Sequence, residues 1–79
     1  MSVLDKNGRR LRVGNWVLYT KLHSVRLTED YFARRIKRIS DGKVIVESED
    51  WGRYSDEVEK LPSNKKEREQ ILFLRKLEQ

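Results

Sequence analysis

Short runs of apolar residues, separated by polar turn residues, extend from residue 3 to residue 61. Runs of this length that are rich in aromatic and β-branched residues are typical of β-strands. The segment 16–22 (WVLYTKL) is such a run. Val17 and Tyr19 would share one face of this strand. Trp16 and Leu18 would share the other, so at least one face must be covered by something beyond the sheet or be exposed for binding.

The segments 31–39 and 43–48 are predicted to be the two arms of a central hairpin. Asp41-Gly42 lies between them, and this dipeptide suits a two-residue turn with positive φ. In the first arm, two isoleucines three residues apart cannot both face inward on a regular strand. We therefore predict a bulge or a bend near Arg38. In the second arm, alternate valines are predicted to share one face.

Further turns divide the rest of the apolar region. Asn7-Gly8, within segment 3–12, suits a two-residue type I′ turn, so we expect a short hairpin or a tight leading loop there. Residues 23–30 are mostly polar, and we predict a loop that connects two strands. Residues 53–61 are predicted to form one or two short strands. Their apolar contacts are Tyr54, Val58 and Leu61.

Residues 64–78 form the one predicted helix. Asn64 followed by Glu67 is a capping-box arrangement. Four apolar residues fall on one arc of this helix, and Leu72 lies off that arc. The four are Ile71, Phe73, Leu74 and Leu77. We expect the helix to fold back on the rest of the chain, with a dimer contact or docking onto another protein as the alternatives.

Four or five short strands, turns marked by glycine and one terminal helix predict a mainly β fold. We expect a small SH3-like barrel in residues 1–62 and a C-terminal α-helix in residues 63–79. Segment 10–17 (RLRVGNWV) resembles the opening L-x-V-G-D-x-V of SH3-like barrels of the KOW, Tudor and chromo-barrel types, including small bacterial and phage proteins. Segment 32–61 resembles the body of a Tudor-type domain. The matching residues, in order, are Phe32, Ile36, Ile39, Val44, Val46, Asp50, Trp51, Gly52, Val58 and Leu61.

The resemblance implies a ligand class for each type of barrel. Tudor-type domains bind methylated lysine or arginine in an aromatic cage. Phe32 and Trp51 match cage positions, but the other two positions fall on Val25 and Ser48, which carry no aromatic ring. An intact cage is therefore not expected. KOW-type barrels bind RNA or ribosomal and transcription proteins, through basic loops and strands.

The composition limits the classes of function. With 79 residues, the chain has room for one domain. Residues 1–39 carry a net charge of +7 and residues 40–79 a net charge of −2, so we expect one face suited to a polyanion or an acidic protein. There is no cysteine, and His23 is the only histidine, which excludes disulfides, thiolate metal sites and most histidine-based catalysis.

Location and catalysis are limited by what the sequence lacks. No apolar segment is long enough to cross a membrane, and the start of the chain lacks the apolar core of a secretory signal. We therefore expect an intracellular protein, cytoplasmic or, in a eukaryote, nuclear, with no membrane or metal partner and with a monomer favoured. Because no nucleophile motif or glycine-rich phosphate loop is present, we expect no enzyme activity and no cofactor.

The densest basic cluster lies in the first arm of the predicted hairpin. It consists of Arg34, Arg35, Lys37 and Arg38. Cations so close together repel one another, and binding to phosphate groups would relieve the repulsion. The alternative is that they pair with carboxylates of the other arm, because opposite charges across two strands attract. Those carboxylates are Glu47, Glu49 and Asp50.

Two further groups are candidates for binding nucleic acid. Arg9, Arg10 and Arg12 lie beside the Asn-Gly turn and either reach a nucleic-acid backbone or form a solubilising loop. Trp51 and Tyr54 either stack on unpaired bases or belong to the core. The sequence thus predicts a non-enzymatic module that binds nucleic acid. The alternative is a protein-interaction module, or a small regulator that docks on a larger protein assembly through the barrel surface or the helix.

Overall fold

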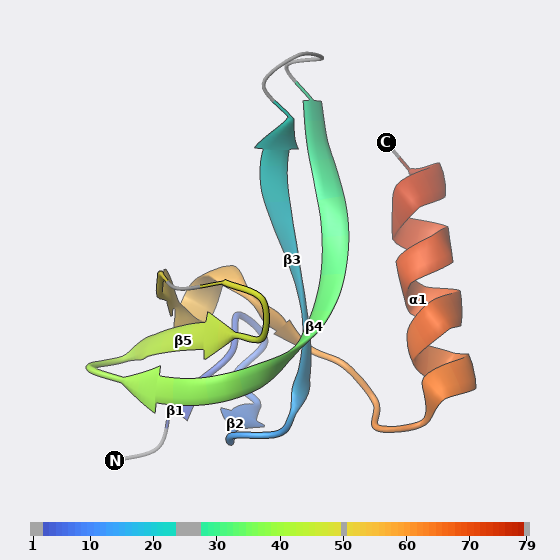
Figure 1. Ribbon diagram of the computed structural model, residues 1–79. Helices are drawn as coiled ribbons and strands as arrows, with labels where there is room; N and C mark the ends of the chain where they lie inside the picture. The colour runs from blue at the N-terminus through green and yellow to red at the C-terminus, as the bar shows by residue number, and fades with distance from the viewer. Residues whose placement is uncertain (1–2, 24–27, 50, 79) are drawn as a thin grey trace.

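Seven strands, one 3-10 helix and one α-helix make up the part of the chain that the structure describes (Figure 1). The structure is a computed structural model, and it describes residues 3–23, 28–49 and 51–78. The strands are β1 (Val3–Leu4), β2 (Arg10–Leu11), β3 (Trp16–His23), β4 (Thr28–Ser40), β5 (Lys43–Val46), β6 (Arg53–Tyr54) and β7 (Glu59–Lys60). The helices are η1 (Ser55–Glu57), between β6 and β7, and α1 (Lys65–Leu77), after β7.

One long strand joins the two halves of the main sheet. β4 pairs with β3 from Thr28 to Arg35 and with β5 from Ile36 to Ser40, and both pairings are antiparallel. The order of the five-stranded sheet is β6-β5-β4-β3-β7, and β1 and β2 form a separate two-stranded sheet. β4 curls between its two pairings, so that the β4–β5 hairpin crosses the β3–β4 arm at a steep angle (Figure 1). The prediction of a mainly β, small barrel-like fold with a C-terminal helix is confirmed.

The curl of β4 coincides with a β-bulge at Lys37. Two adjacent residues of β5 lie opposite Ile36 and Arg38, so Lys37 is the extra residue between them. A bulge interrupts the strict alternation of side chains along a strand. Ile36 and Ile39 can therefore both contact the core, although they are three residues apart. The prediction of a bulge near Arg38 is confirmed.

The turn at Asp41-Gly42 is also the predicted one. The two residues have φ values of 53° and 75°, and Ser40 pairs directly with Lys43. Positive φ at both central positions defines a type I′ turn, whose twist matches that of the flanking strands. The central hairpin of the sequence analysis therefore folds as expected.

The Asn7-Gly8 hairpin is present, but the prediction of a two-residue turn there is wrong. The loop between β1 and β2 spans residues 5–9, and of the dipeptide only Gly8 has a positive φ. The cause is Asp5, whose Oδ1 accepts hydrogen bonds from the backbone N–H groups of Asn7 (2.9 Å) and Arg9 (2.7 Å). A side chain that binds its own backbone in this way competes with the tighter turn.

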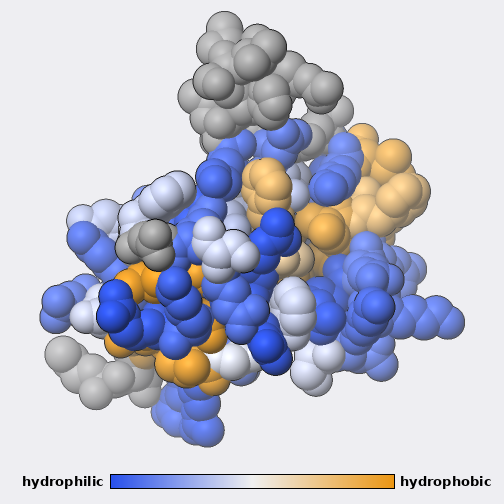
Figure 2. All heavy atoms as spheres, in the orientation of Figure 1, coloured by the Kyte–Doolittle hydropathy of each residue, from blue (hydrophilic) through white to orange (hydrophobic). Residues whose placement is uncertain are grey.

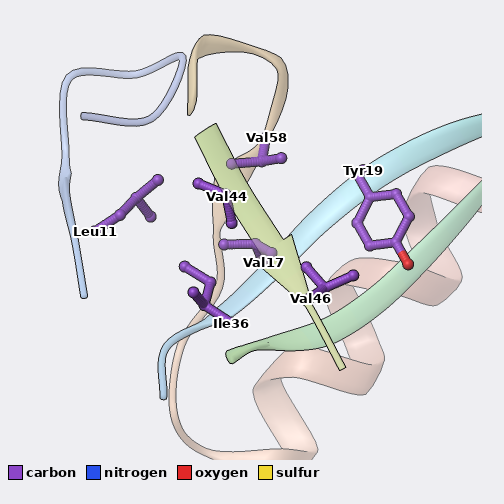
Figure 3. Packing of buried hydrophobic residues seen from close by; sticks show 7 residues of the cluster. All are labelled: Leu11, Val17, Tyr19, Ile36, Val44, Val46 and Val58. Atoms are coloured by element: carbon purple, nitrogen blue, oxygen red, sulfur yellow. The ribbon is translucent and has the colours of Figure 1, made fainter. Parts of the chain in front are cut away.

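The core lies where the curled sheet, the β1–β2 hairpin and the segment after η1 meet (Figure 3). Its seven main side chains are at most 4% exposed. They are Leu11, Val17, Tyr19, Ile36, Val44, Val46 and Val58. Burial of one such side chain stabilises a fold by about 1.5–3 kcal/mol. Val58 and Leu61 are buried as predicted, but Tyr54 is 58% exposed, so its prediction as an apolar contact is wrong.

The face of β3 that points away from this core is covered as well. Leu18, on this face, is 2% exposed. α1 runs beside the β3–β4 arm and packs on β4 (Figure 1). Trp16, Ala33 and Leu72 line a small pocket between the helix and the sheet. The two apolar faces of segment 16–22 are thus explained by the core on one side and the helix on the other.

The helix is capped as predicted, but its buried arc differs from the predicted stripe. Asn64 Oδ1 accepts hydrogen bonds from the N–H groups of Lys66 (2.9 Å) and Glu67 (3.2 Å). The residues of α1 turned toward the sheet follow the spacing i, i+3, i+4, i+7. They are Arg68, which is buried, and Ile71, Leu72 and Arg75, which are half-buried. Phe73, Leu74 and Leu77 are exposed by 61%, 50% and 65%.

Two arginines account for the rotated arc. Arg68 places its guanidinium 3.8 Å from the ring centroid of Trp16 and donates a hydrogen bond to the carbonyl of Ser63 (2.9 Å). Arg75 Nη2 lies 3.1 Å from Glu59 Oε1 on β7. Long arginine side chains cover apolar surface with their methylene groups while the charged end stays bonded. A count of apolar residues alone misses this contribution.

The predicted loop over residues 23–30 is wrong at both ends, where the structure has strands. β3 continues to His23 and β4 begins at Thr28, and these two residues pair with each other. Residues 24–27 lie outside the described residues. The strands of this arm are therefore longer than the isolated apolar positions of the sequence suggested.

Candidate nucleic-acid interface

The four cations of the β4 cluster are exposed and lie on different sides of the strand. Arg34 is on the core side of the sheet, and Arg35 is on the side that α1 covers. Lys37 is the bulge residue. Arg38 follows the bulge and lies opposite Ile45, on the side of β5 that faces away from the core valines.

One cation of this cluster pairs with the acidic arm. Arg35 Nη2 lies 3.2 Å from Glu47 Oε1, and both side chains are about half exposed. An exposed pair of this kind stabilises by about 0–1 kcal/mol. Arg34 donates a hydrogen bond to the carbonyl of Ala33 (2.9 Å). Over residues 3–23, 28–49 and 51–78, Arg34 and Arg38 form no ion pair.

Glu49, the second predicted partner, is bound elsewhere. It is 8% exposed and pairs with Lys21 Nζ (2.9 Å) and with the guanidinium of Arg53. Burial alone would raise the pKa of Glu49, but the hydrogen bonds from Arg53 and Lys21 outweigh it and lower that pKa. The carboxylate of Glu49 is therefore ionised and already paired with Lys21 and Arg53. Asp50, the third predicted partner, lies outside the described residues.

Asp5 holds the second basic group in position. Its Oδ2 accepts a hydrogen bond from the N–H of Lys60 on β7 (2.7 Å), in addition to the two bonds within the loop. Burial tends to raise the pKa of Asp5, and the bonds from Lys60, Arg9 and Asn7 more than reverse this, so the pKa is lowered. The Arg9, Arg10 and Arg12 side chains are exposed around this ordered loop.

Backbone hydrogen bonds place the segment that follows Arg12 beside β4. The N–H of Ile36 donates to the carbonyl of Asn15, and the N–H of Gly14 donates to the carbonyl of Ile36, both at 2.8 Å. The segment after β2 thus runs along β4 just before the bulge. Arg10 and Arg12 form no ion pair within the described part of the chain.

We name these cations together the basic edge. The basic edge consists of Arg9, Arg10, Arg12, Arg34, Arg35, Lys37 and Arg38. All seven were singled out in the sequence, where they fall into two separate groups. The approach of the two groups depends on the contact of the segment after Arg12 with Ile36, which no local pattern in the sequence reports.

The two candidate aromatic residues are both exposed but face different surroundings. Trp51 is 56% exposed, and its ring centroid lies 5.1 Å from Lys21 Nζ and 5.9 Å from Arg53 Cζ. Tyr54 is 58% exposed, and its ring centroid lies 5.3 Å from Lys43 Nζ. Trp51 therefore belongs to a cation–aromatic cluster around Lys21 and Arg53, whereas Tyr54 stands apart from it with Lys43.

Cations of the chain itself contact the aromatics that match cage positions. Lys21 Nζ lies 5.9 Å from the ring centroid of Phe32, besides its contact with Trp51. Arg53 Cζ lies 4.1 Å from the ring centroid of Tyr19, which stacks on Phe32 with centroids 5.9 Å apart. These contacts are the kind that a cage would offer a ligand. Of the other two cage positions, Ser48 is exposed and Val25 lies outside the described residues.

Several residues of this surface were not predicted to lie beside the two aromatic residues. Lys21, Lys43, Glu49 and Arg53 form the contacts with Trp51 and Tyr54, or hold the cations that do. Their meeting depends on the register of β5 with β6 and on how the segment after β5 returns to β3. Only the alternation of charge and aromatic residues around Arg53 hints at it.

The predicted partner-binding residues of α1 divide into two kinds. Ile71 is half-buried, while Phe73, Leu74 and Leu77 are exposed. Figure 2 shows apolar surface gathered over the C-terminal half of α1 and hydrophilic surface over its N-terminal half. A shallow groove beside this half, lined by Leu61, Pro62 and others, separates the helix from β7.

Metal sites and membrane-spanning helices are absent from the described residues. No group of three or more His, Asp or Glu side chains within the described ranges is placed to hold a metal ion. No helix in that part of the chain has the length and apolar character needed to span a membrane.

Comparison with protein-family models, with curated proteins and with solved structures found no match for this chain. The fold and the surface therefore define the class: a small, mainly β, barrel-like protein with a C-terminal helix and a basic edge. The resemblance to SH3-like barrels of the Tudor and KOW types stays a prediction.

Proposed function

We propose that this protein is a non-enzymatic module that binds nucleic acid through the basic edge. The observation that carries the proposal is the joining of two separate arginine groups by the bonds between Ile36, Asn15 and Gly14. Exposed cations gathered around one stretch of β4 suit the negative charge of a phosphate backbone. The proposed contact is with the backbone, which carries no sequence information by itself.

The competing interpretation is that the acidic arm already neutralises these cations. Glu47 pairs with Arg35 in an exposed contact worth about 0–1 kcal/mol, which a phosphate can replace. Glu49 is committed to Lys21 and Arg53 instead. Acidic residues therefore leave Arg34 and Arg38 available within the described part of the chain. Of the two interpretations, binding of these cations to an external anion is therefore favoured over neutralisation by the acidic arm.

The test compares two double variants of equal charge. Arg12→Glu with Arg38→Glu reverses two cations of the basic edge. Lys65→Glu with Lys66→Glu reverses two exposed cations at the start of α1 and changes the net charge by the same amount. Binding of a labelled oligonucleotide is measured by fluorescence anisotropy. We expect the first variant to lose at least about tenfold in affinity and the second to lose much less, because contact charges act locally under salt screening.

Equal losses in the two variants would contradict the proposal, since binding would then depend on overall charge alone. Absence of binding in the unchanged protein at low salt would contradict it outright. Circular dichroism of both variants checks that the fold is kept, since all four positions are exposed.

The second candidate function is docking onto another protein through α1. One specific observation favours it: Phe73, Leu74 and Leu77 are each at least half exposed on the same half of the helix. Exposed apolar patches of this kind often mark interaction sites. Leu74→Asp would then abolish capture of a protein partner, and that capture would survive nuclease and high salt. Nucleic-acid binding would be unaffected by the same substitution.

A further inference from the structure

The outer face of the β4–β5–β6 sheet carries a second set of exposed groups. In this part of the sheet Ser40 pairs with Lys43, and Lys43 pairs with Tyr54. Residues directly opposite each other in antiparallel strands point to the same side. Because Val44, the residue after Lys43 on β5, points into the core, Lys43 and Tyr54 point outward. Arg38 also lies on this side, through its pairing with Ile45.

Tyr54 is the exposed ring of this outer face. The residue is 58% exposed, and Lys43 Nζ lies 5.3 Å from the ring centroid. The contact with Lys43 is a cation–π interaction at an exposed site, which is weak. Stacking of a nucleic-acid base on an aromatic ring is stronger. A base can therefore displace Lys43 from the ring, and the freed ammonium group is then available to a phosphate.

Two cations on the neighbouring strands, both on the same side of the ring, suit the backbone that such a base would carry. Lys43 is on the strand next to Tyr54. Arg38 is one strand further and two residues along from the pair of Ser40 and Lys43, so its backbone is about 12 Å from that of Tyr54 at the usual spacings of strands and residues. Arg38 also belongs to the basic edge. One strand of nucleic acid could thus contact the basic edge and continue over Arg38 to Tyr54.

The ring can accept only a base whose face is free. In a duplex each base is stacked on both sides, whereas an unpaired base offers its face to an aromatic side chain. Given the proposed function, on which this inference rests, we propose that the outer face of β5 and β6 binds single-stranded nucleic acid by stacking one unpaired base on Tyr54. Lys43 and Arg38 contact the adjacent phosphates. The ring discriminates single strands from duplexes and is tolerant of base identity.

Trp51 does not share this role, although it lies close to Tyr54 in the sequence. Its ring contacts Lys21 and Arg53, both held by the buried Glu49. A base on Trp51 would have to compete with this bonded cluster. The structure therefore singles out one of the two aromatic residues that the sequence offered.

The experiment uses the full chain and three probes of equal length: a single-stranded oligothymidylate, a duplex, and a strand of abasic sugar-phosphate units. Tyr54→Ala is expected to weaken binding of the single strand by about 5- to 100-fold. Binding of the duplex and of the abasic strand should change by less than about twofold. Tyr54→Phe keeps the ring and should retain the affinity of the unchanged protein. Trp51→Ala, the matched control, should alter single-strand binding by less than Tyr54→Ala does.

The possible results separate this inference from the proposed function. If Tyr54→Ala binds the single strand as tightly as the unchanged protein, the stacking role is overturned, while the loss caused by Arg12→Glu with Arg38→Glu would still support backbone binding. Equal weakening for the single strand and the abasic strand would also overturn it, because no base is then involved. If none of the three probes binds, the proposed function fails together with the inference. Urea unfolding of Tyr54→Ala verifies that this exposed substitution leaves the fold intact.

Discussion

Asp5 is the residue on which the geometry of the β1–β2 loop depends most. It is 4% exposed, and its carboxylate accepts three backbone hydrogen bonds: from Asn7 (2.9 Å), Arg9 (2.7 Å) and Lys60 (2.7 Å). Two of these bonds shape the loop, and the third attaches it to β7. Asp5→Asn keeps the shape of the side chain but removes its charge and one of its two acceptor oxygens.

The expected loss follows from those three bonds. With the amide oxygen at the Oδ1 position, the bond from Lys60 is lost, at about 1.5–3 kcal/mol for a bond to a charged group. The bonds from Asn7 and Arg9 persist but weaken, because neutral acceptors bind about half as strongly. We expect a total of about 2–4 kcal/mol, against a stability of about 4–12 kcal/mol for a chain of 79 residues. A loss of this size is easily measured.

The assay is urea unfolding followed by tryptophan fluorescence. Asp41→Asn is the matched control, because Asp41 is exposed and its φ of 53° is one that asparagine tolerates. The control should change the free energy of unfolding by less than about 0.5 kcal/mol. If Asp5→Asn is as stable as this control, the role given to the three bonds is refuted.

The pH dependence gives the same test a second readout. The folded protein lowers the pKa of Asp5 below its ordinary value of 3.8. Its stabilising effect is therefore complete above pH 3.8 and is lost as the pH falls through the lowered folded pKa. The difference in stability between the unchanged protein and Asp5→Asn should shrink below pH 3.8. A difference that stays constant down to pH 2 would contradict the lowered pKa.

Three further outcomes are expected. Glu49→Gln should reduce the free energy of unfolding at pH 7 by about 1–3 kcal/mol. Because the pKa of Glu49 lies below its ordinary 4.5, this loss should diminish as the pH falls below 4.5. A loss independent of pH would argue against the lowered pKa. Gly52→Ala should lower the free energy of unfolding in urea by about 1–3 kcal/mol, because a Cβ there would lie 2.9 Å from the Cβ of Lys43. An unchanged midpoint of unfolding would contradict this close contact between Gly52 and Lys43. Leu72→Asp should lower the melting temperature more than the matched Leu74→Asp, and the reverse order would contradict the buried arc of α1.

The central hairpin shows where sequence reasoning succeeds. The turn at Asp41-Gly42 and the bulge before Arg38 are determined by residues close together in the chain: a dipeptide suited to positive φ, and two isoleucines with the wrong spacing for a regular strand. Local geometry decides both features, so the sequence is enough to predict them.

The helix and the first hairpin show where it fails. The buried arc of α1 includes Arg68 and Arg75, whose burial depends on Trp16 and Glu59 in distant strands. The loop after β1 is set by a carboxylate that also binds Lys60. Neither partner can be identified from apolar periodicity or from turn dipeptides.

The candidate site divides in the same way. The residue types of the basic edge were predicted from the density of charge. Their union depends on the bonds of Ile36 to the segment after β2, and the separation of Tyr54 from Trp51 depends on the register of β5 with β6. Contacts of this kind arise from tertiary structure and leave no local pattern.

The most direct test of the account is the salt dependence of binding to a labelled oligonucleotide. Of the basic edge, Arg10, Arg12, Arg34 and Arg38 form no ion pair in the described part of the chain and, unlike Arg9, have no charge interaction with Asp5. If each contacts one phosphate, the plot of log affinity against log salt concentration has a slope of about −3 to −3.6. Affinity then falls about 60- to 150-fold between 50 and 200 mM salt, and Arg12→Glu with Arg38→Glu makes the slope shallower by about 2. A slope near zero, or one that this double variant leaves unchanged, would contradict binding at the basic edge.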